Sequence, residues 1–238
     1  MNKPTERPSN AEVLRVYKHI DRKFRADPGG TAQLLTKPGL RFSGFEASTK
    51  EGLTFPEDAA HALGTTQALV DADRVEFAEI FLGSTGLESL ISNPHFSGVR
   101  ELALLDCDWV LGEELGPKIG FGLAESHFTG LEILRLAALR IGDDAAAAMM
   151  NSSVFSNLKH VNLYQIGLTD AIIEPLINSP WWDQLTTLFV RDIKNPATLE
   201  ILLNAPEPKN LERMCFSGWN DRKTAADLLD RRYGKNTS

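Results

Sequence analysis

Four side chains of this sequence have types and spacings that chemistry could use. His95 and His127 hold equivalent positions in two neighbouring copies of a repeat, so they could bind one metal ion or titrate together. Asp143 and Asp144 form an acidic pair, a residue type used for metal binding and acid–base catalysis. The later copies of the repeat carry other residue types at the histidine position, namely Val154, Trp181 and Glu207. We therefore expect no shared function for the histidines, and the acidic pair has a structural explanation at a helix start.

Sequence motifs of the common enzyme classes are absent from this chain. It has no Ser-centred nucleophile elbow, phosphate-binding P-loop, zinc-protease helix or Cys–His zinc pattern. Gly120 and Gly122 form a Gly-x-Gly, but the third glycine of a dinucleotide site is missing. We therefore expect a protein that is not an enzyme and that has no cofactor and no metal site.

Cys107 and Cys215 are the two cysteines of the chain. They lie four repeats apart, which at ~4.7 Å per parallel strand places them roughly 19 Å from each other. That distance is far beyond the reach of a disulfide bond. We expect two reduced thiols.

The elements that position these side chains come from a repeat that the chain carries five times between residues 92 and 216. Its copies are SNPHFSGVRELAL, AESHFTGLEILRL, NSSVFSNLKHVNL, NSPWWDQLTTLFV and NAPEPKNLERMCF. Their aligned anchor residues are 32, 27, 27 and 26 residues apart: Val99, Leu131, Leu158, Leu185 and Leu211. Such spacings are typical of a solenoid in which each repeat is one strand and one helix.

Each copy predicts a β-strand with alternating inward and outward side chains. Apolar residues recur three and five positions after the anchor, so both should point into the core. These pairs are Leu102/Leu104, Leu134/Leu136, Val161/Leu163, Leu188/Val190 and Met214/Phe216. A weaker upstream copy anchored at Ala72 adds Val75/Phe77, which makes six strands.

Each strand is followed by a turn and a stretch with helical character. Asp143 and Asp170 precede two of these stretches, and Thr198 and Thr224 take nearly the same place in later repeats. We expect these four residues to be helix N-caps. A bulky column three residues before the anchors is expected to seal the helix-to-strand corner: Phe96, Phe128, Phe155, Trp182 and Pro208.

At these residues the chain resembles the ribonuclease-inhibitor-like class of leucine-rich repeats. It is especially similar to bacterial arrays with a Ser-Pro turn before each strand, here Asn93-Pro94 and Ser179-Pro180, and an Ile-Gly-Asp turn after it. The resemblance implies a right-handed α/β solenoid, a horseshoe arc with about six parallel strands on its concave face, convex helices and a protein-binding function. One departure is the position eight after the anchor, commonly Asn or Cys in such families. Here it is apolar apart from Cys107, so no asparagine ladder is expected there.

The repeats divide the chain into three regions. We expect a helical N-terminal cap and weakly defined first turns over residues 1–69, the solenoid over 70–232 and a polar tail over 233–238. Capping-box spacing from Ser9 to Glu12, followed by apolar residues at helical spacing from Val13 to Phe24, predicts an amphipathic helix in the cap.

Two segments have sequence patterns that predict their structure less clearly. Residues 31–53 carry no clear pattern. Residues 111–122 belong to the one repeat that is five residues longer than its neighbours, and we expect them to form a protruding loop.

The composition favours a soluble cytoplasmic protein. A formal net charge of -7 disfavours nonspecific nucleic-acid binding, which needs a basic surface to displace phosphate counterions. No apolar run approaches the ~18 residues of a membrane span, and the amino terminus lacks the apolar stretch of a secretory signal. We therefore expect a protein partner, with basic proteins favoured by the overall charge, and neither nucleic acid nor membrane.

The outward positions of the strands predict the binding surface. Side chains two, four and six positions after each anchor should point onto the concave face. Its amino half is expected to expose Arg74, Glu76, Glu101, Ala103 and Leu105. Its carboxyl half carries the aromatic and arginine side chains that interfaces favour. There we expect the partner to contact Arg135, His160, Tyr164, Phe189, Arg191 and Arg213.

The sequence therefore predicts a non-enzymatic protein–protein interaction module, an adaptor or an inhibitor, that binds its partner through the concave sheet. Two alternatives stay open. One is a regulator of a partner enzyme, such as a GTPase-activating type of protein in which Arg135 or Arg191 acts on a nucleotide bound to the partner. The other is a structural subunit of a larger complex. The identity of the partner and the oligomeric state stay undetermined.

Leu134→Asp tests the strand register. We expect this substitution to unfold or strongly destabilise the protein, because a buried unpaired carboxylate is costly or must be neutralised. Thermal unfolding followed by circular dichroism measures the effect. An unchanged melting temperature would show that Leu134 does not point into the core.

Overall fold

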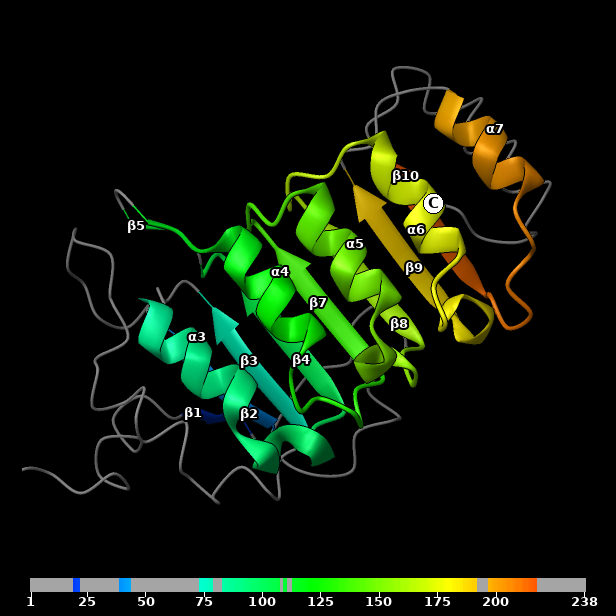
Figure 1. The fold of residues 1–238 in the computed structure, drawn as a ribbon. Coiled ribbons are helices and arrows are strands. Elements are labelled where there is room, and N and C mark those ends of the chain that lie inside the picture. Colours follow the sequence, from blue (N-terminus) through cyan, green and yellow to red (C-terminus); the bar gives the residue numbers. More distant parts are fainter. Residues whose placement is uncertain are drawn as a thin grey trace, which may run out of the picture.

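The structure is a computed structural model of the 238-residue chain. It describes residues 19–21, 39–43, 73–78, 83–107, 109–110, 113–191 and 197–217. These residues form an α/β fold in which helices cover one face of a single open main sheet (Figure 1). The predicted α/β class and its open sheet of parallel strands are confirmed.

The main sheet has eight strands in the order β1-β2-β3-β4-β7-β8-β9-β10. The six predicted strands are present and run parallel to one another: β3 (Arg74–Ala78), β4 (Glu101–Leu105), β7 (Ile133–Ala137), β8 (His160–Tyr164), β9 (Thr187–Arg191) and β10 (Arg213–Ser217). β2 (Gly39–Ser43) adds a further parallel strand, and β1 (His19–Asp21) pairs with it in the antiparallel sense. A separate antiparallel pair consists of β5 (Trp109–Val110) and β6 (Glu113–Glu114).

Successive strands pair in the register that the repeat predicts. Val75 pairs with Leu102, and this ladder continues to Met214 on β10. A second ladder runs from Phe77 to Phe216. Every member of the two ladders whose side chain is described is at most 3% exposed. The residues three and five after each anchor therefore form the core, as predicted.

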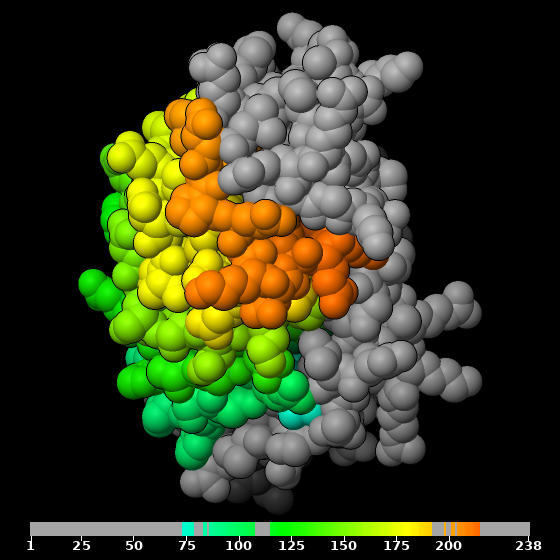
Figure 2. All heavy atoms as spheres, turned by 90° about the vertical axis from the view of Figure 1, so that its right-hand side faces the viewer, coloured from blue at the N-terminus to red at the C-terminus, as the bar shows by residue number. Residues whose placement is uncertain are grey.

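In the described part of the chain, five α-helices cover the apolar face of the sheet (Figure 1). They are α3 (Gly83–Ser92), α4 (Gly116–Ala124), α5 (Asp143–Asn151), α6 (Ile173–Ile177) and α7 (Ala197–Asn204). Short 3-10 helices accompany them: η2 (Pro94–Gly98), η3 (Ser153–Phe155), η4 (Asp170–Ile172) and η5 (Trp182–Gln184). Figure 2 shows the repeats stacked in chain order, from green to orange. Buried helix residues such as Leu90, Ile119 and Ala145 join the strand ladders in one core.

The bulky column before the anchors is confirmed. Phe96 and Phe128 lie with ring centroids 5.1 Å apart, and the later members Phe155, Trp182 and Pro208 are also buried. The column closes the corner between helix and strand in successive repeats.

The predicted N-cap role of Asp143 and Asp170 is wrong by one residue. Gly142, with φ 77°, is the N-cap of α5, and Thr169 is the N-cap of η4. The Asp143 carboxylate instead accepts hydrogen bonds from the backbone N–H (2.8 Å) and the hydroxyl (2.5 Å) of Thr169. Asp170 likewise accepts from the Thr198 hydroxyl at 2.6 Å. The recurrence of Asp and Thr therefore reflects bonds between neighbouring repeats.

The protruding loop expected over residues 111–122 is wrong from Gly116 onward, because α4 begins there. The extra residues of this repeat lie in the β5–β6 hairpin. Gly120 faces α5, where a Cβ atom would come within 2.7 Å of the Ala145 Cβ atom. Gly120 therefore permits close packing of α4 against α5, and Gly122 faces Ile91 of α3.

The amino-terminal region departs from the helix expected between Val13 and Phe24. Residues 19–21 form β1, in which Ile20 pairs with Leu40 of β2. Pairing with the sheet outweighs the helical spacing of the apolar residues. Three predictions lie outside the described residues: the remainder of that helix, the N-cap at Thr224 and the tail over 233–238.

A ladder of side-chain amides joins neighbouring repeats, although position eight after the anchor supplies no asparagine. Each amide stands one residue before an anchor and donates to a backbone carbonyl of the preceding repeat. The bonds are Asn157 to Thr129 (2.8 Å), Gln184 to Ser156 (2.5 Å) and Asn210 to Asp183 (3.2 Å). The ladder holds successive repeats at a constant offset.

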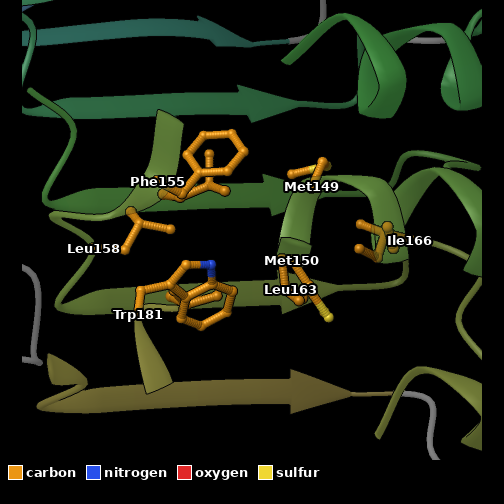
Figure 3. Close-up of a pocket in the computed structure, with 10 residues that line it drawn as sticks. Met149, Met150, Phe155, Leu158, Leu163, Ile166 and Trp181 are labelled. Atoms are coloured by element: carbon orange, nitrogen blue, oxygen red, sulfur yellow. The ribbon is translucent and has the colours of Figure 1, made fainter. Parts of the chain in front are cut away.

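The core contains a small apolar cavity beside α5 and β8 (Figure 3). Phe155, Leu158 and Trp181 lie on one side of it, and Met149 and Met150 lie on the other. The centre of a water molecule could occupy about 10 Å³ of this cavity. That volume is close to the minimum needed to hold one water. Among the described residues, no acceptor reaches the buried Trp181 Nε1. A buried water needs at least two polar partners, so this cavity stays dry.

The residue after three of the strands has a left-handed backbone conformation. These residues are Asp106 (φ 55°), Ala138 (φ 52°) and Gln165 (φ 52°), all seven positions after their anchors. The Ala138 N–H donates to the Tyr164 carbonyl of the next repeat at 2.9 Å. The conformation thus directs a donor to the neighbouring strand, at a cost of about 1–2 kcal/mol for a non-glycine residue.

Ala138→Gly is expected to stabilise the protein. Glycine removes the left-handed cost of about 1–2 kcal/mol and loses roughly 0.5–1 kcal/mol more backbone entropy on folding. Urea unfolding should therefore show a gain of about 0.5–1 kcal/mol in the free energy of unfolding. Ala137→Gly, one residue earlier within β7, is the matched control and should lose roughly 0.5–1 kcal/mol. Equal losses in both variants would show that Ala138 is not strained.

Candidate functional site

The candidate site lies on the face of the sheet turned away from the helices, here called the distal face. It is formed by the first, third and fifth residue of each strand, because alternate residues of a strand point to opposite faces. On β7 to β10 these positions hold Ile133, Arg135, Ala137, His160, Asn162, Tyr164, Thr187, Phe189, Arg191, Arg213, Cys215 and Ser217. The register therefore places all six residues predicted to bind a partner on this face.

The amino half of the distal face is a buried ion-pair cluster. Arg74 lies 2.7 Å from Glu76 Oε2 and 3.3 Å from Glu101 Oε1, and Arg135 lies 3.6 Å from the same Oε1. Arg74, Glu76 and Glu101 are 7%, 5% and 1% exposed, and Ala103 is buried with them. The prediction that these side chains stand exposed is therefore wrong. The register brings opposite charges on neighbouring strands together, and the paired groups are buried.

Glu101 is the central group of this cluster. Burial raises the pKa of its carboxyl above the ordinary value, although the positive charges of Arg74 and Arg135 act in the opposite direction. Within the part of the chain that the structure describes, no hydrogen-bond donor reaches its second oxygen, Oε2. The desolvation of this carboxylate is therefore only partly offset by its two cationic neighbours.

Arg135 marks the boundary between the two halves of the distal face. Its guanidinium faces Glu101, and its side chain is 26% exposed. His160, on the next strand, is half-buried, with its two ring nitrogens 3.2 and 3.3 Å from the Thr186 hydroxyl. Both predicted contact residues are thus engaged within the protein, and each keeps part of its surface accessible.

The carboxyl half holds an arginine stacked on an aromatic ring. The guanidinium carbon of Arg191 lies 4.9 Å from the centroid of the Tyr164 ring, a distance typical of a cation–π contact. Arg191 is exposed, whereas Tyr164 and Phe189 are half-buried. Among the described residues, no carboxylate forms an ion pair with Arg191. This side presents a charged group and two aromatic rings to solvent.

A second set of ion pairs lies one residue before the strands. Arg100 is 2.8 Å from Glu132 Oε1, and Lys159 is 3.1 Å from Glu132 Oε2. Burial acts to raise the pKa of Glu132, but hydrogen bonds from Lys159 and Arg100 outweigh it and hold the pKa below the ordinary value. The pKa values of Glu132 and Glu101 are therefore shifted in opposite directions.

The described residues offer little for metal or thiol chemistry. No three His, Cys, Asp or Glu side chains among them converge as a metal site would require. Cys107 is a buried cysteine whose sulfur lies 3.3 Å from the carbonyl oxygens of Phe77 and Leu105. The side chain of Cys215 is outside the described set. Nor does any described helix combine the length and apolar character that crossing a bilayer requires.

No family model and no curated protein matches this chain. The role of the distal face is therefore inferred from its own geometry. That geometry places an exposed guanidinium and two half-buried aromatic rings side by side on the regular frame of the strands.

Sequence reasoning missed the buried cluster and the stacking of Arg191 on Tyr164. A signal for both was present, because Arg74 and Glu101 hold the same strand position in neighbouring repeats. Tyr164 and Arg191 are likewise each six positions after an anchor. In-register strands place such residues side by side.

Glu101→Gln and Glu132→Gln should change the pH dependence of stability in opposite ways. The folded-state pKa of Glu101 is raised, so wild type should lose stability relative to Glu101→Gln as pH rises above 4.5 through that pKa. The folded-state pKa of Glu132 is lowered, so wild type should lose its advantage over Glu132→Gln as pH falls below 4.5. Urea unfolding of the three proteins over a pH series measures both differences. Two difference curves that slope in the same direction would contradict this assignment.

Proposed function

We propose that this protein is a non-enzymatic protein–protein interaction module, an adaptor or an inhibitor. We further propose that its repeats are leucine-rich repeats of the ribonuclease-inhibitor-like type. The in-register parallel strands support this repeat type, and β3, β4, β7, β8 and β9 are each followed by a helix before the next strand of the sheet. The partner binds the distal face over β7 to β10.

One observation carries this proposal: Arg191 is exposed and already ordered against Tyr164, beside the half-buried Phe189. Aromatic and arginine side chains dominate the binding energy of protein interfaces. Ordering a long side chain at an interface costs roughly 0.5–1.5 kcal/mol, and the stacking on Tyr164 reduces that cost before the partner arrives. Strand positions also hold these groups more rigidly than a loop would.

Phe189→Ala is expected to weaken partner binding roughly thirtyfold, or by ~2 kcal/mol, without lowering the melting temperature appreciably. The immobilised protein is incubated with an extract of cells that express it naturally, and the retained proteins are quantified by mass spectrometry.

Phe121→Ala is the matched control, since Phe121 is 48% exposed on α4, on the helix-covered side. This control should retain the same proteins as wild type. Equal retention by wild type and Phe189→Ala, or equal losses in both variants, would refute docking on the distal face.

A further inference from the structure

The charged side chains of the distal face over β7 to β10 are all basic. Its twelve positions include three arginines and one histidine but no Asp or Glu, although the whole chain carries a net charge of -7. The acidic members of the adjoining cluster, Glu76 and Glu101, are buried and ion-paired. Because Arg135 is ion-paired with Glu101, the positive charge that a partner meets on this face is centred on Arg191, and it is opposite in sign to the charge of the protein as a whole.

Arg191 has the geometry of a carboxylate-binding group. Its guanidinium carbon lies over the Tyr164 ring, 4.9 Å from the centroid, and no described carboxylate pairs with it. A contact with the face of a ring uses none of the five N–H donors of a guanidinium as a hydrogen bond to an acceptor oxygen. Arginine binds a carboxylate through two such N–H groups in parallel. The exposed edge of Arg191 therefore suits an Asp or Glu side chain.

The basic residues are spread along the face. Arg191 is the fifth residue of β9 and Arg213 the first residue of the adjacent β10. At ~3.3 Å per residue and ~4.8 Å between strands, their backbones are roughly 14 Å apart. An extended peptide covers that span with roughly four residues, whereas one compact anion does not.

The basic partner favoured by the overall charge of the chain does not fit this face. Screening by salt limits the influence of a charge to about 8 Å at physiological ionic strength, so Arg191 acts on a segment docked against it more strongly than acidic residues on the helix-covered side do. A basic segment would be placed against Arg191 without a carboxylate to pair with. An acidic segment gains an ion pair there and can still place an apolar side chain against Phe189.

We propose that the partner presents an extended acidic segment, in which Asp or Glu residues flank one aromatic or aliphatic side chain. The segment crosses β8 to β10 with a carboxylate on Arg191 and its apolar side chain against Phe189. This inference rests on the proposed function and specifies the chemistry of the partner.

The probe is a library of random peptides of roughly eight residues, long enough to extend across these strands. Peptides are enriched on the full-length protein and counter-screened against Phe189→Ala, so that only Phe189-dependent binders remain. The best binders are then titrated by fluorescence polarisation against wild type, Arg191→Glu and Lys118→Glu. Lys118 is exposed on α4 and provides the same change of charge on the helix-covered side.

We expect enriched peptides with a net negative charge, whose affinity falls at least about thirtyfold in Arg191→Glu and less than about threefold in Lys118→Glu. Added salt should weaken the binding of these peptides. Phe189-dependent peptides that are neutral or basic would overturn the acidic segment while leaving the docking face intact. If no Phe189-dependent peptide is enriched, the docking face itself is refuted. Tighter binding of single-stranded oligothymidine than of any peptide would assign the face to nucleic acid instead and overturn the proposal.

Discussion

The distal face depends on one hydrogen-bonding arrangement that holds each repeat in register with the next. The carbonyl of Arg100 accepts the backbone N–H groups of both Glu132 and Ile133, at 2.8 and 2.9 Å. The carbonyls of Glu132, Lys159 and Thr186 accept two N–H groups each in the same way. A slip of one residue would exchange the core face for the distal face. The shared acceptor before each strand opposes such a slip, so segments far apart in sequence build one continuous surface.

The charged side chains are paired differently in the two halves of the distal face. In the amino half, Glu76 and Glu101 are balanced by Arg74 and Arg135 at the expense of desolvation, which raises the pKa of Glu101. Buried ion pairs of this kind contribute little net stability, but removing one partner is costly. In the carboxyl half, Arg191 stays at the surface and makes a cation–π contact with Tyr164. The charges of the first half are thus paired within the protein, whereas the second half leaves a guanidinium at the surface.

Alternation of apolar residues made six strands predictable, because a pair such as Leu102 and Leu104 leaves only one face for the core. β2 has the same alternation in Leu40 and Phe42 but was missed, since Lys37 stands where an apolar anchor is expected. The burial of Glu101 could not be predicted from its own strand, because it depends on the charges that neighbouring strands place beside it. The Asp–Thr bonds between repeats were mistaken for caps because both recur at helix starts. One linear pattern cannot distinguish a bond within a repeat from a bond to the next.

The longest repeat shows where the chain tolerates added length. The helix start, Gly116, stands nine positions after Cys107, whereas in the next repeat the helix start, Asp143, stands four positions after Leu139. That difference of five equals the difference between the 32- and 27-residue spacings of the anchors. The whole insertion therefore falls after a strand, where it leaves the amide ladder and the shared carbonyls undisturbed. Evolution or protein engineering can use the same place after Leu139 to graft a recognition loop beside the distal face without changing the scaffold.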